Sequence, residues 1–275
     1  MTARPTPGLK RAPASDAPDA VAEATPLPET PREPARVPAA TAAPLRRLVE
    51  IGSTFLAVIG FRVERLNAVW VAGGVASIGL AHFLIGRGDW RLTVPYFFAT
   101  LVAYYGGNTA ILASRGPTRL VARLGEAAAF RRYETILGLM FLNQGLGVGC
   151  MTALPLGRVP IAPWIAVSVG IGLFVAGAVV KLWATLVVGV DVYYYRDMFL
   201  GRRIGPRAVS GPYRLLRNPM YGVGQLQGYG WALVAGSLPG LLAAAAGHLL
   251  IFAFYLAVER PFVRRVYPPS PAPAA

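Results

Sequence analysis

Long apolar runs separated by short polar connections limit what this chain can fold into. Of its 275 residues, 55% are hydrophobic and 15% are charged, and the charged residues fall almost entirely outside the apolar runs. A helix needs about 20 apolar residues to cross the hydrocarbon core of a bilayer, and only helices or closed barrels satisfy their backbone there. The sequence therefore predicts an all-α fold, a polytopic helical bundle integral to a membrane.

The chain has about five to six such apolar segments. They cover residues 66–85, 94–113, 135–156, 164–184, 221–236 and 239–258. We expect the fourth to continue as helix toward Val190. A Ser-Leu-Pro-Gly sequence at 237–240 divides the last two, which make either two crossings or a hairpin. The apolar part of 45–65 is too short to span a bilayer, so an interfacial or packed helix is expected there.

The remaining organisation follows from these runs. Residues 1–44 are rich in Pro and Ala and hold few large apolar side chains, which predicts a disordered tail. We expect N-terminal transmembrane helices over 66–157, a membrane core over 158–267 and a flexible tail over 268–275. The single cysteine, Cys150, excludes an intramolecular disulfide and a cysteine-based zinc site, and no metal site is predicted.

Basic residues orient the expected bundle. The chain has 27 Lys and Arg against 13 Asp and Glu. Because the arginines flank apolar runs, their expected partners are anionic lipid headgroups and not nucleic acid. Five arginines lie in 115–132 and six in 196–217, whereas 87–91 has two and the connection at Arg158 has one. The positive-inside rule then places both termini and the loop before Tyr221 in the cytoplasm.

Polar residues inside the runs are functional candidates, because they are costly in hydrocarbon. Lys181 lies near the cytoplasmic end of its run, where its long stem is expected to reach the headgroups. His248 is expected to pack, and Asn143 and Gln144 to form hydrogen bonds between helices. Aromatic residues over 193–231 form either an interfacial belt or a site for a cationic group.

Small residues in the fourth run leave a similar choice. Ser168, Gly172 and Ala176 are four residues apart, and Gly170 and Gly172 form a Gly-x-Gly. Such a face favours close packing against another helix. Alternatively, the missing side chains let a flat ligand approach the backbone. Spacing alone favours packing.

Motifs in the second half of the chain carry a resemblance to a known family. Three motifs resemble those of the membrane phospholipid methyltransferase (phosphatidylethanolamine N-methyltransferase-like) family. They are Asn-Pro-Met-Tyr at 218–221, the glycine-rich segment 228–232 and Ser-Leu-Pro-Gly-Leu at 237–241. Ser-Gly-Pro-Tyr-Arg at 210–214 resembles the isoprenylcysteine carboxyl methyltransferases of the same superfamily, although Arg-Asn-Pro here holds Asn where that branch has His. The resemblance covers Trp164 to Tyr267.

The resemblance implies that S-adenosylmethionine binds at the cytoplasmic ends of the last four segments. In the phospholipid branch a Gly-x-Gly and a Glu before Pro-Phe bind this cofactor, which implies that role for Gly170, Gly172 and Glu259. The residues expected to line the cofactor pocket are Gly170, Gly172, Tyr213, Arg217, Asn218, Pro219, Tyr221 and Glu259. One departure is Arg260, since animal members have a second glutamate at that position.

The expected activity is S-adenosylmethionine-dependent N-methylation of an amine phospholipid headgroup such as phosphatidylethanolamine. The acceptor amine must lose a proton, and Glu259 and Asp197 are the candidate catalytic carboxylates. An alternative is a carboxyl O-methyltransferase of isoprenylcysteine type, acting on a lipidated or hydrophobic acid. The alternative of another class is a non-enzymatic membrane transporter or scaffold, which the lack of a paired internal repeat disfavours.

Overall fold

The computed structural model describes residues 44–205 and 208–267. Within these ranges the chain forms α-, 3-10 and π-helices and no β-strand, which confirms the all-α prediction. The elements in order are α1 (Pro44–Val58), η1 (Val63–Arg65), α2 (Ala68–Arg87), α3 (Trp90–Leu101), η2 (Val102–Gly107), α4 (Asn108–Ala113), α5 (Gly116–Leu124), α6 (Glu126–Ala153), α7 (Pro163–Val188), α8 (Val190–Tyr193), α9 (Arg196–Leu200), η3 (Gly211–Arg214), η4 (Val223–Gln225), α10 (Leu226–Val234), α11 (Leu238–Phe254), η5 (Tyr255–Glu259) and α12 (Arg260–Val266). The predicted tails lie outside the described residues, except for Pro44, which begins α1.

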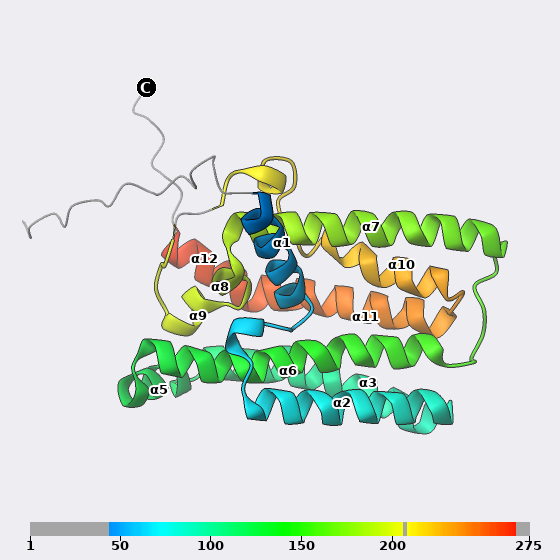
Figure 1. The fold of residues 1–275 in the computed structure, drawn as a ribbon, viewed down its shortest axis with the longest axis horizontal. Coiled ribbons are helices and arrows are strands. Elements are labelled where there is room, and N and C mark those ends of the chain that lie inside the picture. Colours follow the sequence, from blue (N-terminus) through cyan, green and yellow to red (C-terminus); the bar gives the residue numbers. More distant parts are fainter. Residues whose placement is uncertain (1–43, 206–207, 268–275) are drawn as a thin grey trace, which may run out of the picture. The chain divides into compact units, whose positions relative to one another are not determined.

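Among the described residues, four helices are long and apolar enough to cross a membrane, which fits a multi-pass membrane protein. They are α2, α6, α7 and the helical run Leu238–Val266, which α11, η5 and α12 form together. Their axes lie side by side (Figure 1). A further run, made of α3, η2 and α4, extends from Trp90 to Ala113, where the sequence predicts the second apolar segment.

Local signals fix where these helices begin and end. The side chain of Asn67 accepts a hydrogen bond from the Trp70 amide, 3.0 Å away, and caps the start of α2. Ser237 caps α11 in the same way, accepting from the Gly240 amide at 3.1 Å. The helix α7 ends at Val188 and is followed by Gly189, whose φ of +85° disfavours any L side chain. This turn begins the irregular segment that carries the candidate site.

Of the two alternatives for 221–236, a full crossing or part of a hairpin, the structure excludes a helix that crosses fully. Only Leu226–Val234 is α-helical there. Nine residues of helix measure about 14 Å, less than half of the ~30 Å hydrocarbon core. The next helical run is longer than predicted, because it continues past Val258 to Val266. As a result α10 accompanies α7 and α11 along one half of the bundle only (Figure 1).

Glycines let α10 approach α7 closely. A Cβ added to Gly170 would lie 2.8 Å from the carbonyl oxygen of Gly230, and a Cβ added to Gly230 would collide with the carbonyl oxygen of Gly170. The face of α7 that carries Gly170 is therefore the packed one. The predicted packing stripe of Ser168, Gly172 and Ala176 is wrong, because these three residues are exposed.

We expect Gly170→Ala to destabilise the protein by about 1–3 kcal/mol, since the added methyl group overlaps the α10 backbone. Gly172→Ala is the matched control. No atom lies within 4 Å of its added Cβ, and alanine favours helix, so this variant should be neutral or stabilised. The apparent melting temperature of the purified protein in detergent measures both effects. Equal losses from the two variants would contradict the packing assignment.

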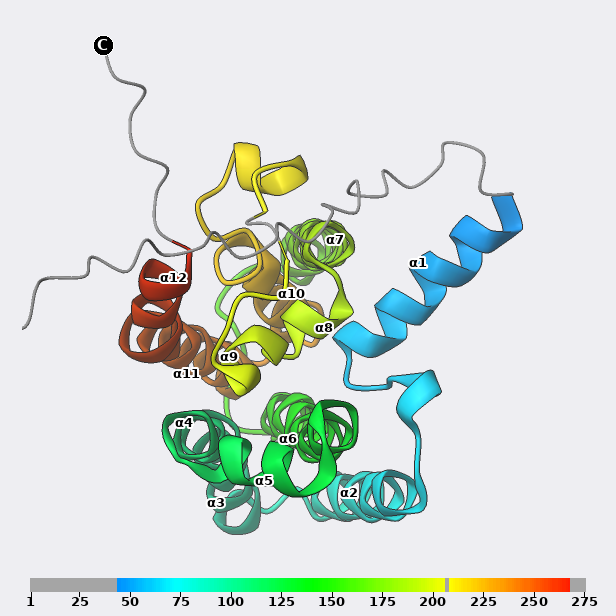
Figure 2. The same cartoon turned by 90° about the vertical axis from the view of Figure 1, so that its left-hand side faces the viewer.

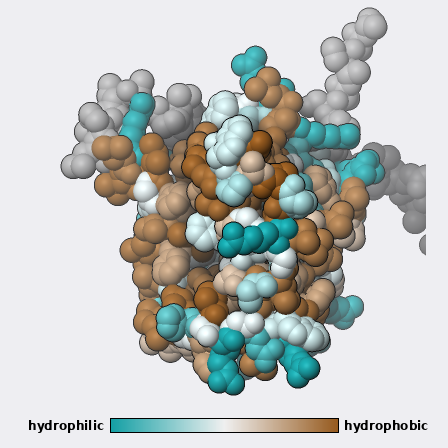
Figure 3. All heavy atoms as spheres, turned by 90° about the vertical axis from the view of Figure 1, so that its right-hand side faces the viewer, coloured by the Kyte–Doolittle hydropathy of each residue, from teal (hydrophilic) through white to brown (hydrophobic). Residues whose placement is uncertain are grey.

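The connecting segments divide between the two ends of the bundle. α5, α8, α9 and α12 lie at one end, on the left in Figure 1, and the connection 154–162 lies at the other. The arginines from Arg115 to Arg132 and from Arg196 to Arg203 therefore meet at one end. Figure 3 views the opposite end, where hydrophobic side chains cover much of the flanks. The outer faces of the helices are apolar, as lipid contact requires.

The helix α1 lies across the bundle instead of along it (Figures 1 and 2). It packs on α7 and α8, and burial of Thr54, Ala57 and Val58 marks the packed side. On its other side Leu48 and Val49 are exposed. An apolar helix that runs across the spans and keeps an exposed apolar side suits the plane of a membrane surface.

Candidate active site

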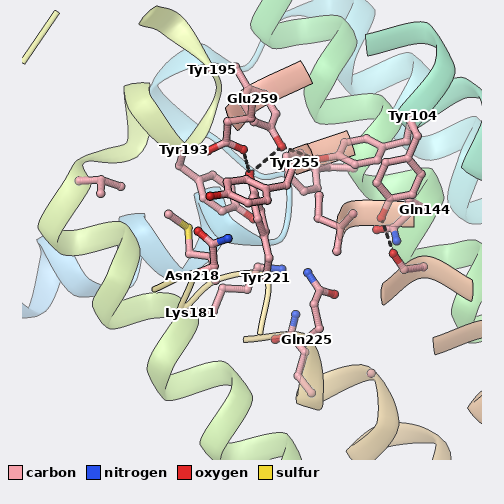
Figure 4. Close-up of a pocket in the computed structure, with 18 of the residues that line it drawn as sticks. Tyr104, Gln144, Lys181, Tyr193, Tyr195, Asn218, Tyr221, Gln225, Tyr255 and Glu259 are labelled. Carbon is pink, nitrogen blue, oxygen red and sulfur yellow. Dashed lines mark hydrogen bonds between the residues drawn. The ribbon is translucent and has the colours of Figure 1, made fainter. Parts of the chain in front are cut away.

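A cavity of about 1130 Å³ lies among α6, α7 and α11. Arg217 and Arg264 line it at the arginine-rich end of the bundle, and Phe174 and Trp231 line the part farther from that end, where both are exposed on the apolar surface. The cavity exists because α10 is short. In the half of the bundle that α10 does not occupy, an irregular segment that includes 208–225 stands beside α7 and leaves space (Figures 1 and 4).

Glu259 enters this cavity from a π-helical turn, Tyr255–Glu259. Pro261 follows the turn; it has no amide hydrogen, and its ring crowds the carbonyl group of Ala257, four residues before it. A widened turn of this kind re-aims the side chains that it carries, and such turns are frequent at functional sites. Both Tyr255 and Glu259 line the cavity.

The Glu259 carboxylate is held by a chain of tyrosine hydroxyls. The Tyr221 hydroxyl donates to Oε2 of Glu259 at 2.6 Å (Figure 4). The Tyr221 and Tyr195 hydroxyl oxygens are 3.3 Å apart, and so are those of Tyr195 and Tyr104. The other carboxylate oxygen, Oε1, has no hydrogen-bond partner among the described residues. Glu259 therefore has one oxygen fixed and one available to a ligand.

The backbone at Tyr195 is strained. Its φ of +58° and ψ of +33° are left-handed, and it is the only non-glycine residue with positive φ in the described part of the chain. Such a conformation costs about 1–3 kcal/mol and persists only where neighbours enforce it. Here the preceding tyrosines do so, because the Tyr193 and Tyr194 hydroxyls donate to the carbonyl oxygens of Val58 and Ala57 at 3.1 and 2.9 Å. The end of α1 thus fixes the turn that aims Tyr195.

Asp197 is the second carboxylate of the cavity. It is buried, its Oδ1 accepts from the Met198 amide at 2.8 Å, and its Oδ2 lies 3.4 Å from the Tyr267 hydroxyl. Burial raises the pKa of Asp197 above its usual range, although these hydrogen bonds oppose the shift. Burial and the nearby Glu259 likewise raise the pKa of the Tyr213 hydroxyl.

The structure brings most of the predicted site residues together. Those that line the cavity are Asp197, Tyr213, Arg217, Asn218, Tyr221 and Glu259. Pro219 lies beneath the cavity wall, fully buried, and its carbonyl oxygen accepts from the Gly224 amide at 2.8 Å. Gly170 and Gly172 do not line the cavity, because Gly170 packs against α10 and Gly172 is exposed. The cofactor-binding roles of all these residues stay predictions.

Two residues in the spans have roles that sequence reasoning missed. Lys181 is only 9% exposed and lines the cavity, so the prediction that it reaches the headgroups is wrong. His248 donates from Nε2 to the carbonyl oxygen of Tyr221 at 2.8 Å, and its Nδ1 accepts from the Tyr229 hydroxyl at 3.2 Å. It therefore positions the backbone that carries Tyr221. The only available signal was the cost of a polar side chain in an apolar run.

The two predicted interhelical amides behave differently. Asn143 accepts from the Tyr96 hydroxyl at 3.0 Å and donates to Oγ of Ser77 at 2.9 Å, which joins α6 to α3 and α2 and confirms its prediction. Gln144, one residue further along α6, points into the cavity instead (Figure 4). Adjacent helical positions face different directions, and this alone separates their roles.

An ionic network lies behind the strained tyrosine turn. Arg62 pairs with Glu134 of α6 and, at 2.6 Å, with Asp191 of α8, and Arg196 also pairs with Asp191. The Glu134 side chain is only 1% exposed. Burial opposes ionisation of Asp191, but the two guanidinium groups hold its pKa below the ordinary value. The network ties the segment after α1 to both α6 and the turn that carries the tyrosines.

We expect Arg62→Met to destabilise the protein by about 1–3 kcal/mol, because the buried Glu134 would keep only the longer contact with Arg65, at 3.6 Å, and Asp191 would keep only Arg196. Arg202→Met is the control, since it breaks an exposed pair with Glu126 and should cost no more than about 1 kcal/mol. Thermal unfolding in detergent gives both values. Losses of similar size would show that the network does not stabilise the site.

Comparison with known proteins finds matches over the segment that supplies most of the cavity wall. Residues 165–270 match the phospholipid methyltransferase family model. The resemblance given by the sequence motifs is thereby confirmed, and over nearly the predicted range. The matched segment contains α7 from residue 165 onward and every described element after it, and with them Asp197, Asn218, Tyr221 and Glu259.

Fungal proteins are similar to part of this chain. The phosphatidylethanolamine N-methyltransferase of Schizosaccharomyces japonicus is 36% identical over 101 residues, which are 37% of this chain and 11% of that protein. The protein of the same description from Meyerozyma guilliermondii is 34% identical over 113 residues, 39% of this chain and 13% of its own. The chain thus spans about a tenth of the length of the curated relatives that it matches. No solved structure matches the chain.

Proposed function

We propose that the chain is an S-adenosylmethionine-dependent membrane methyltransferase that N-methylates an amine phospholipid headgroup such as phosphatidylethanolamine. The observation that carries this proposal is the cavity at the arginine-rich end, where Asn218, Tyr221 and Glu259 meet. These residues lie in the segment that matches phospholipid methyltransferases. Both fungal relatives are described as phosphatidylethanolamine N-methyltransferases.

The residues of the cavity fit the proposed cofactor. S-adenosylmethionine supplies an electrophilic methyl group on a positively charged sulfur and also carries an ammonium group. Glu259 offers a free carboxylate oxygen for a cationic group, and Tyr195 and Tyr221 bring aromatic rings to the same wall. A volume of about 1130 Å³ exceeds that of most single-ligand pockets, so a cofactor and a lipid headgroup fit together.

We assign the role of general base to Asp197, the second carboxylate of the cavity. An ammonium headgroup has no free electron pair, so a proton must leave nitrogen before nitrogen attacks. In this proposal Glu259 holds the cationic group of the cofactor, which leaves Asp197 for the acceptor. Burial raises the pKa of Asp197, which makes it a stronger proton acceptor than an ordinary aspartate. The remaining task of the protein is to align the reactants and exclude water, which a buried cavity does.

The arginine-rich end would lie on the cytoplasmic side, where the cofactor is made. The positive-inside rule supports this orientation, with both termini on that side. The lipid would reach the cavity from the adjoining leaflet, because Phe174 and Trp231 line the cavity and are also 41% and 52% exposed on the apolar surface.

We expect Glu259→Gln to weaken S-adenosylmethionine binding at least tenfold, because it removes the free carboxylate while preserving shape. Binding of the radiolabelled cofactor to the purified protein measures this. Glu64→Gln, which removes an exposed carboxylate outside this cavity, is the matched control. Unchanged affinity in Glu259→Gln would remove Glu259 from the cofactor site.

The acceptor is tested with labelled S-adenosylmethionine and a total lipid extract, followed by mass spectrometry of the products. N-methylated ethanolamine lipids support the proposal. Methyl esters of a lipidated or hydrophobic acid would contradict the proposal and favour the carboxyl O-methyltransferase reaction of isoprenylcysteine type. If no acceptor gives a labelled product, the remaining alternative is a non-enzymatic membrane protein.

Methyl transfer should fall as the pH is lowered through the pKa of Asp197, because only the ionised carboxylate accepts a proton. Since burial raises this pKa, the fall should occur at a higher pH than an ordinary aspartate would give. Asp197→Asn should lower the rate by about 10²–10⁴-fold and abolish this part of the pH–rate profile. A profile unchanged in shape in the variant would assign the proton to another group.

A further inference from the structure

Lys181 is a buried cation that faces the cavity from α7. It is 9% exposed, and none of the described residues forms an ion pair or hydrogen bond with its ammonium group. Three arginines also line the cavity: Arg217 and Arg264 are exposed and Arg260 is half-buried. An unpaired ammonium within a membrane span is costly and marks a functional position. A ligand with a negative charge would offset this cost.

The fold holds Lys181 in place for such a ligand. A Cβ added to Gly224 would lie 3.3 Å from Cβ of Lys181 and 3.6 Å from its Cγ, so the glycine leaves room for the lysine stem. One turn further along α7, Thr185 donates to the Lys181 carbonyl oxygen at 2.8 Å. The stem of Lys181 therefore lies against the same irregular segment that carries Asn218 and Tyr221.

Lys181 lies where the polar and apolar parts of the cavity meet. Phe174, Lys181 and Val188 follow one another at intervals of seven residues on one face of α7, and all three line the cavity. Each interval measures about 10 Å along the helix. Val188 is at the arginine-rich end, whereas the Phe174 ring lies farther from that end, with its centroid 6.5 Å from that of the exposed Trp231.

The cavity thus presents three kinds of group in order. Glu259 and Asp197 supply negative charge, Lys181 supplies positive charge, and Phe174 and Trp231 open to the apolar exterior. Among the residues labelled in Figure 4, Glu259 lies toward the top of the view and Lys181 toward the bottom. An amine phospholipid has the complementary order of ammonium, phosphate and alkyl chains.

We infer that Lys181 binds the phosphodiester group of the acceptor lipid and so presents its amine to Asp197. The identity of this acceptor rests on the proposed function. Lysine suits the role, because its ammonium is a compact point charge that binds phosphate without the planar geometry that arginine imposes. The carboxylate of S-adenosylmethionine is the competing anion, but a water-soluble cofactor would meet the exposed Arg217 and Arg264 first.

The first test compares two acceptors that differ in phosphate. Purified Lys181→Met protein is assayed with short-chain phosphatidylethanolamine and with dodecylamine, which has an amine but no phosphate. The KM for the phospholipid should rise tenfold or more, with the KM for dodecylamine and the affinity for S-adenosylmethionine unchanged. Lys181→Arg should raise the KM for the phospholipid less than Lys181→Met does. Arg158→Met, which removes an exposed charge at the other end of the bundle, should leave this KM unchanged.

Three results would overturn the inference. They are an unchanged phospholipid KM, an equal loss with both acceptors, and a tenfold weaker binding of S-adenosylmethionine in Lys181→Met. The last would assign Lys181 to the carboxylate of the cofactor. Thermal unfolding of each variant identifies losses that come from misfolding, and Lys181→Arg keeps the test informative if the methionine variant does not fold.

A second test needs no methyl transfer. The chain has only two lysines, Lys10 and Lys181, so a ¹³C-lysine label in a Lys10→Arg protein reports on Lys181 alone. Its NMR signal should shift on addition of short-chain phosphatidylethanolamine and not on addition of dodecylamine. If this shift occurs but no acceptor is methylated, the proposed function fails and the phosphate site stands. If methylation occurs without the shift, the phosphate site fails alone.

Discussion

Backbone groups outside a helix must find hydrogen-bond partners within the protein when they lie at membrane depth, because hydrocarbon offers none. The turn beside Lys181 meets this requirement locally. The Gly222 amide donates to Asn218 at 2.9 Å and the Gly224 amide to Pro219 at 2.8 Å, while His248 donates to the Tyr221 carbonyl. Because its backbone groups are hydrogen-bonded within the protein, this turn can take the place of half of a membrane-crossing helix. The cavity is the space that the missing half-helix would have filled.

The site depends on parts of the chain that lie far from it in sequence. Tyr195 reaches Tyr221 only because its backbone is held in a left-handed conformation, and the end of α1 holds it there through Tyr193 and Tyr194. The ionic network around Arg62 ties the same region to α6. The segment that matches phospholipid methyltransferases starts at residue 165, yet Tyr104 and Gln144 complete the wall of its cavity. The first half of the chain is therefore part of the site.

Charge gives the cavity its direction. Carboxylates and tyrosines gather near the arginine-rich end, a single buried lysine lies further in, and aromatic rings open to the apolar surface. A lone carboxylate or a lone ammonium would be costly at this depth, and both become favourable only with a ligand of opposite charge. The arrangement suits an amphiphile that carries both signs better than it suits a neutral solute.

The sequence by itself determined the all-α fold, the approximate positions of the long helices and the gathering of arginine-rich connections at one end, because run length and loop charge are local properties. Its ordered motifs also located the segment that supplies most of the cavity wall. Only the tertiary structure decided that α10 is too short to cross, that Gly170 packs and Gly172 does not, and that Lys181 turns inward. These outcomes depend on which face of one helix meets which neighbour, and residue spacing along a uniformly apolar run leaves that face unspecified.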